Sequence, residues 1–153
     1  MNYDKTVDYI DIKKFMGEWY VIAGRFTFLE KGAHNGLEVY TWNKENKRID
    51  IEFSFNKDSF DGELKTITQK GWIENIKTNS HWKISPLWPL KFDYLVIDLA
   101  KDYSWTAVGV PSGKYLWIMA RDKAMDKETR EMILKRLKAK AYPINDISIV
   151  PHK

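Results

Sequence analysis

The sequence predicts an all-β protein in which eight antiparallel strands run up and down and close into a barrel (calyx), followed by one α-helix and a short final strand. Short segments in which apolar and polar residues alternate, separated by turn residues, fill the chain up to position 120. The apolar period then lengthens to that of a helix over 126–141. Seven Trp, eight Tyr and seven Phe residues fit this prediction, because large aromatic side chains favour strands.

Length and composition indicate one domain that spans residues 1–153. A chain of this size buries about two thirds of its unfolded surface without metals or disulfides. The absence of Cys excludes disulfides and thiolate metal sites. The net charge of +4 is not gathered into a dense Lys/Arg block, so we expect no nucleic-acid partner. No apolar run approaches the roughly 18 residues that a membrane-spanning helix needs.

The third predicted strand, residues 48–55, shows the clearest alternation. Ile49, Ile51, Phe53 and Phe55 fall on one face, and a loop of Asn, Lys and Glu residues precedes the strand. The other predicted strands are 19–26, 37–42, 63–73, 81–85, 91–100, 105–110 and 114–120. Connections this short make consecutive strands antiparallel neighbours, and a meander of eight strands can close on itself and so remove its edges.

The predicted helix has its apolar residues three or four positions apart, at Ile133, Leu134, Leu137 and Ala141. Asp126 is the expected N-cap. A proline two residues after the helix prevents further helical hydrogen bonding. Residues 146–150 then form the predicted final strand.

Three short motifs lie at the ends of these strands. They are Gly17-Glu18-Trp19, Lys101-Asp102-Tyr103 and the single residue Arg121. With them the sequence resembles the lipocalins, calyx-shaped carriers of apolar ligands, although Lys101 stands where the family has Thr. The resemblance implies that the Trp19 indole plugs the closed end of the barrel and that Arg121 lies across it. A guanidinium over an indole face contributes roughly 0.5 to 2 kcal/mol.

Further segments resemble the bacterial branch of the family, the outer-membrane lipoprotein type. They occur in the family's order and are Trp88-Pro89-Leu90, Tyr94-Leu95-Val96, Pro111-Ser112 and Tyr115-Leu116-Trp117-Ile118. Leu90 and Gln69 depart from the residues usual in that branch. The resemblance implies a helix packed outside the barrel and non-enzymatic binding, transport or storage of a small hydrophobic ligand, a fatty acid or a lysophospholipid.

Alternation from an inward-facing Trp19 and an Arg121 at the base predicts which side chains face the interior. The expected ligand-binding residues are Val21, Ala23, Ile51, Phe53, Phe55, Ile67, Tyr94, Tyr115, Trp117 and Met119. The expected residues of the barrel base are Gly17, Trp19, Asp102, Tyr103 and Arg121. The alternative is that the interior residues fill a solid core, because eight strands can do either. A ligand head group at the mouth would meet Lys91, Lys114 or Arg25, unless these are ordinary surface residues.

The sequence indicates no enzyme. Its three histidines, His34, His81 and His152, lack metal-ligand spacing, and no Ser lies in a nucleophile-elbow pattern. We therefore expect no catalytic residue, no metal site and no cofactor. Acid–base catalysis by Glu30 with His34 and haem bound through one histidine stay open as alternatives.

Location and association also stay open. The helix at 126–141 has one basic and one apolar face, which is typical of a membrane-surface helix as well as of one packed on a barrel. A monomer or a homodimer is possible, with Tyr20, Tyr40 or Trp42 as outward aromatic contacts. The resemblance implies the cell envelope, whereas the lack of a secretion signal in residues 1–14 and of an anchoring Cys suggests a cytoplasmic protein or a trimmed chain.

Overall fold

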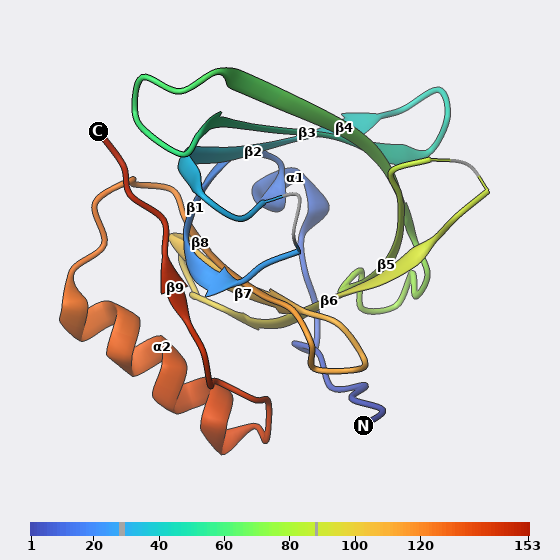
Figure 1. Ribbon diagram of the computed structural model, residues 1–153. Coiled ribbons are helices and arrows are strands. Elements are labelled where there is room, and N and C mark those ends of the chain that lie inside the picture. The colour runs from blue at the N-terminus through green and yellow to red at the C-terminus, as the bar shows by residue number, and fades with distance from the viewer. Residues whose placement is uncertain (28–29, 88) are drawn as a thin grey trace.

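The computed structural model describes residues 1–27, 30–87 and 89–153 and confirms the predicted closed barrel (Figure 1). The strand order is β2-β3-β4-β5-β6-β7-β8-β1, and pairing of β1 with β2 closes the ring. The strands are β1 (Gly17–Arg25), β2 (Ala33–Asn43), β3 (Arg48–Lys57), β4 (Leu64–Ile73), β5 (His81–Ser85), β6 (Phe92–Leu99), β7 (Trp105–Gly109) and β8 (Leu116–Ala120). Trp88, the first residue of an aromatic-Pro motif, lies outside the described residues.

The N-terminal segment adds one helical turn that the sequence did not predict. This turn, α1 (Ile12–Phe15), begins at Asp11, whose side chain accepts a hydrogen bond from the Lys13 amide. Figure 1 shows α1 within the outline of the barrel. Phe15 is fully buried, with its ring 5.1 Å from that of Trp19 and 5.5 Å from that of Trp82. The helix therefore closes the base of the barrel with an aromatic cluster.

Arg121 joins this base to the end of β8. Its guanidinium lies 3.7 Å from the centre of the Trp19 ring and donates to the carbonyls of Lys14 (2.7 Å) and Glu18 (2.7 Å). The Trp19 indole N–H in turn donates to the Phe15 carbonyl over 2.8 Å. Backbone groups that neither helix nor sheet satisfies are thus paired by one cation and one indole.

Two of the remaining expected residues of the base, Gly17 and Tyr103, lie against Arg121. Gly17 has a φ of 99°, which favours glycine, and a β-carbon there would lie 3.5 Å from Arg121. The Tyr103 hydroxyl accepts from the Asp11 amide over 2.9 Å. Asp102 lies in the exposed turn before β7, where its carboxylate accepts from the Ser104 amide over 3.0 Å.

The C-terminal helix, α2 (Lys127–Ala139), lies outside the barrel, beside strand β9 (Ser148–Ile149) (Figure 1). Its buried residues Ile133 and Leu137 pack against outward side chains of β1, β6, β7 and β8. The apolar face of this helix therefore covers the barrel. Within the described ranges, neither helix is long and apolar enough to cross a membrane.

An ion pair between a half-exposed arginine and a buried carboxylate attaches α2 to the sheet. Arg136 donates through two nitrogens to the Asp98 carboxylate, at 2.7 and 2.9 Å, and the Asp98 side chain is 3 % exposed. Asp98 points outward because a β-bulge interrupts the register between Val96 and Asp98. A bidentate pair of this kind fixes the direction of the helix as well as its contact.

A second bulge overturns one prediction. Ala23 was expected to face the interior, but the register with β8 shifts between Val21 and Ala23. Val21 stays inside the barrel, while Ile22 and Ala23 both belong to the cluster under α2. Simple alternation fails here because an extra residue in one strand reverses the faces that follow it.

The C-terminal segment closes a seam in the barrel wall. Strand β1 pairs with β2 only from Gly17 to Tyr20, and β9 pairs with its upper part at Ala23 and Gly24. On the other side of the seam, the Asn35 amide donates to the Pro151 carbonyl over 2.8 Å. The segment after α2 therefore connects two strands that have separated from each other.

We expect Arg121→Ala to lower the free energy of unfolding by about 2 to 4 kcal/mol, because the indole loses its cation and four carbonyls lose a charged donor. Arg121→Lys should keep only part of this stability, since an ammonium group cannot reproduce the planar set of N–H donors of a guanidinium. Urea unfolding measures both. The control is Arg48→Ala, which breaks a partly exposed pair with Asp50 worth at most about 1 kcal/mol. Equal losses in Arg121→Ala and Arg48→Ala would contradict the role of the base.

Candidate functional site: a cavity inside the barrel

The interior of the barrel is hollow, with a cavity of about 680 Å³. Seven of the residues expected to face a ligand line it: Ile51, Phe53, Ile67, Tyr94, Tyr115, Trp117 and Met119. Two others lie in the packed core beside it. Val21 borders a separate small gap, and Phe55 stacks on Phe53 with ring centres 5.2 Å apart. Ala23 is on the outer face of the sheet, as described above.

A pair of tyrosines separates the cavity from the aromatic base. The hydroxyls of Tyr40 and Tyr94 are 2.8 Å apart, and the Tyr40 hydroxyl also lies 3.9 Å from the Met119 sulfur. The Tyr94 ring stacks on the fully buried Trp82 at 4.5 Å and 3°. These contacts give the cavity a floor that is aromatic in its bulk and polar where the hydroxyls meet.

Tyr40 corrects another prediction, because the sequence suggested it as an outward aromatic. The side chain is 2 % exposed and packs in the core cluster with Phe15 and Trp82. Tyr40 lies opposite Gly17 in β1 and Ile51 in β3, and both neighbours belong to the interior side of the sheet. The inward face of β2 therefore carries Tyr40 rather than Leu37 and Val39.

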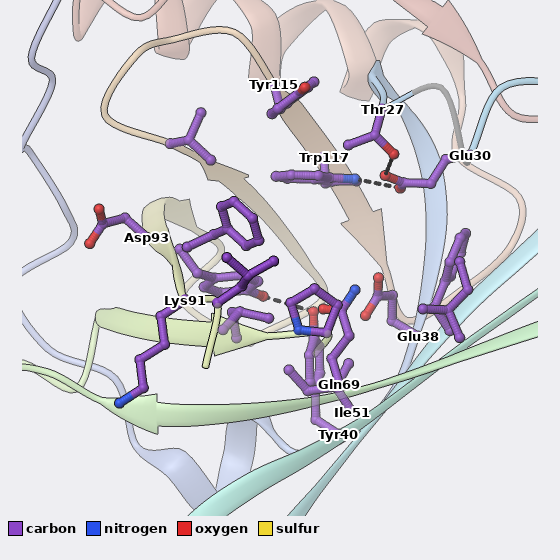
Figure 2. A pocket seen from close by; sticks show the side chains of 18 of the residues that line it. Thr27, Glu30, Glu38, Tyr40, Ile51, Gln69, Lys91, Asp93, Tyr115 and Trp117 are labelled. Carbon is purple, nitrogen blue, oxygen red and sulfur yellow. Dashed lines mark hydrogen bonds between the residues drawn. The ribbon is translucent and has the colours of Figure 1, made fainter. Parts of the chain in front are cut away.

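Glu30 forms part of the upper wall (Figure 2). Its carboxyl accepts from the Trp117 indole N–H and from the Thr27 hydroxyl, both over 2.8 Å. Burial raises the pKa of the Glu30 carboxyl, although both hydrogen bonds favour its ionised form. The bond to Glu30 also fixes the plane of the Trp117 ring against the cavity.

Glu38 is a cavity residue that the sequence analysis missed. It lies opposite the inward-facing Trp19 in the β1–β2 ladder, so its side chain points into the barrel. Figure 2 shows its carboxyl on the same side of the cavity as Glu30. Burial raises the pKa of Glu38 to about 8, and the negative charge of Glu30 adds to this effect, while a contact with Tyr40 opposes it. The register of β2 against β1 would have identified Glu38, because it places this residue opposite Trp19. Strand propensity alone does not give that register.

The mouth carries one of the basic residues that we expected there. Lys91 lines the cavity, and its ammonium lies 4.8 Å from the centre of the Trp72 ring. Arg25 is instead occupied with the carbonyls of Gly113, Lys114 and Asn145. Neither Arg25 nor Lys114 is among the described residues that line the cavity. Gln69 and Leu90, the two departures from the bacterial pattern, both line the cavity.

The histidines lie elsewhere. His34 contacts the Gly32 carbonyl at 2.9 Å, His81 contacts Asp93 at 2.7 Å and His152 contacts the Val21 carbonyl at 2.7 Å. None of the three lines the cavity as the described residues define it. His34 and Glu30 are therefore not brought together as an acid–base pair. Over the same described ranges, no group of three or more His, Asp or Glu side chains is arranged to hold a metal ion.

Comparison with known proteins identifies the family. The model of the lipocalin-like domain matches residues 10–152. This chain belongs to the lipocalin family. Lipocalins bind small hydrophobic ligands, and the hollow barrel described above is the corresponding feature of this lipocalin.

The curated relatives of this lipocalin include plant and bacterial proteins. Temperature-induced lipocalin-1 of Arabidopsis thaliana is 26 % identical over 152 residues, which cover 96 % of this chain and 82 % of the relative. Outer membrane lipoprotein Blc of Vibrio cholerae is 22 % identical, covering 95 % and 85 %. Blc of Escherichia coli is 27 % identical, covering 84 % and 72 %. The resemblance to the bacterial branch is thus confirmed, and it extends to a plant lipocalin.

Solved structures support the fold of this lipocalin. Insecticyanin from the tobacco hornworm superimposes with a TM-score of 0.74 at 17 % identity, over 100 % of this chain and 87 % of that one. Lobster apocrustacyanin A1 gives a TM-score of 0.70 at 14 % identity, over 92 % and 79 %. At this identity the likeness concerns the barrel and its helix.

The Glu38 carboxyl, which lines the cavity, makes the stability of this lipocalin depend on pH. Because the folded-state pKa of Glu38 lies near 8 rather than at the ordinary 4.5, the folded protein holds this proton more tightly than the unfolded chain. The stabilisation of the folded state by this bound proton is fully present below about pH 4.5 and is lost as the pH rises through 8. We expect Glu38→Gln to be more stable than the parent at pH 9, by a few kcal/mol at most, with a smaller difference at pH 5.

Urea unfolding at the two pH values measures this difference. Glu52→Gln, on the exposed outer face of β3, is the control and should show no such change with pH. A difference between Glu38→Gln and the parent that is the same at pH 5 and pH 9 would be evidence against a raised Glu38 pKa.

Proposed function

We propose that this lipocalin binds one single-chain amphiphile, a fatty acid or a lysophospholipid, reversibly and without chemical change, and so carries or stores it. The observation that supports this most strongly is the cavity of about 680 Å³, which is walled mainly by apolar and aromatic side chains. Cavities of some 300 to 1,000 Å³ with such walls are typical sites for small ligands.

The energy of binding follows from the hydrocarbon chain. Each buried methylene contributes about 0.8 kcal/mol, so a chain of about twelve to sixteen carbons supplies roughly 10 kcal/mol. The ligand and the rim side chains lose freedom on binding, which reduces this value. Micromolar affinity corresponds to about 8 kcal/mol, so it is reached where these costs remove no more than about 2 kcal/mol.

The mouth supports the entry of such a ligand. Leu90 and Phe92 line the cavity at its rim, and each is 55 % exposed. Lys91 lies between them in sequence and provides a cation for an acidic head group. A tail that enters first would leave its head group beside this lysine.

The first experiment is a titration of the delipidated protein with a long-chain fatty acid and with a lysophospholipid, followed by tryptophan fluorescence. Trp117 lines the cavity, so an occupied cavity should change its emission with a dissociation constant in the micromolar range or below. A flat titration with both compounds, confirmed by calorimetry, would refute the proposal.

We further expect Ile67→Trp to weaken the binding of these ligands at least tenfold, because the added ring occupies the cavity. Thr68→Trp is the matched control, since Thr68 is the next residue of β4 and is exposed on the outer face. The same titration compares the two variants, with circular dichroism as the check of folding. Unchanged affinity in Ile67→Trp would place the ligand outside the barrel.

A further inference from the structure

The ionisable groups of the cavity are unevenly distributed. Away from the rim, those that face it are two carboxyls, Glu30 and Glu38, and two phenols, Tyr40 and Tyr94. At the rim lie Lys91, Asp93 and a third phenol, Tyr115. Among the described lining residues, Lys91 is the one with a cationic side chain. Below the rim, the described lining residues therefore offer oxygen acceptors but no cationic side chain that would pair with an anion.

The two carboxyls differ in how far their hydrogen-bonding capacity is already used. Glu30 is held by Trp117 and Thr27, which occupy both of its oxygens. Glu38 contacts the Tyr40 hydroxyl, which is also bonded to Tyr94. A carboxylate has about four acceptor sites, so Glu38 keeps capacity toward the open cavity. Figure 2 shows its carboxyl directed into that space.

We propose that Glu38 binds the ammonium group of a long-chain amine, so that the cavity prefers cationic single-chain amphiphiles to alcohols and fatty-acid anions of the same length. An ammonium carries three donors, which suit the Glu38 carboxylate and the two phenol oxygens around it. Above pH 8, where Glu38 is ionised, a carboxylate in the same place would face a group of its own charge. This inference rests on the proposed binding of a single-chain amphiphile in the cavity and extends the ligands to amines.

The state of Glu38 gives the proposal a second consequence. With a pKa near 8, Glu38 is mostly protonated in the empty protein at pH 7. An alkylammonium stabilises the ionised carboxylate, so its binding at pH 7 releases close to one proton from Glu38. Below pH 8 the affinity for the amine should therefore rise roughly tenfold for each pH unit. An uncharged alcohol releases no proton.

The experiment is isothermal titration calorimetry of the delipidated protein with decylamine, decanol and decanoate. At pH 9, where Glu38 is mainly ionised and the amine still charged, decylamine should bind at least about tenfold more tightly than decanol. Titrations at pH 7 in two buffers of different ionisation enthalpy count the protons released. Glu38→Gln should abolish both the preference and the proton release while it keeps the affinity for decanol.

Two variants control this result. Glu52→Gln removes the same charge from the exposed face of β3 and should behave as the parent does. Glu38→Asp keeps the carboxylate and should keep part of the preference for the amine, which shows that a loss in Glu38→Gln is not a loss of fold. If decylamine and decanol bind equally at pH 9, or if Glu38→Gln retains the preference, the inference is wrong although the proposed function stands. If none of the three compounds binds, the proposed function itself fails.

Discussion

The architecture depends on how one end of the barrel is sealed. A closed sheet needs no edge protection, but its ends expose backbone groups and an open interior. Here Trp19 fills the interior at the base, and Arg121 covers the indole while it bonds the carbonyls at the end of α1. Because the large aromatic side chains of Phe15, Trp19 and Trp82 pack at that end, the opposite end can stay hollow. The cavity is therefore a consequence of the plug as much as of the number of strands.

The sequence predicted the barrel because its strands are short, alternate regularly and are joined by brief connections. Residues 48–55 show this best, since every apolar position there is buried in the structure. Prediction failed where local pattern and tertiary pairing disagree. Ala23 changed sides at a bulge, and Glu38 and Tyr40 face inward because β2 is paired with Trp19 and Gly17. Helix α1 is only four residues long and therefore left no periodic signal.

The cavity combines two physical environments. Its walls remove apolar surface from water and so attract hydrocarbon without regard to direction, as expected for a family that carries hydrophobic ligands. The floor and the upper wall contain carboxyls and phenols whose burial is costly unless they are protonated or paired. The apolar walls thus contribute most of the affinity for a hydrocarbon chain, and the polar groups determine its orientation.

The seam between β1 and β2 also constrains how the barrel forms. Its upper half is bridged by residues near position 150, which bond Ile22 on one side and Asn35 on the other. Strands β1 to β8 can pair in sequence as they leave the ribosome, but the wall has a slit until the segment after α2 is in place. A nascent chain would therefore complete its sheet before the barrel wall is closed, and the docking of the segment around residue 150 would decide when a ligand can be retained.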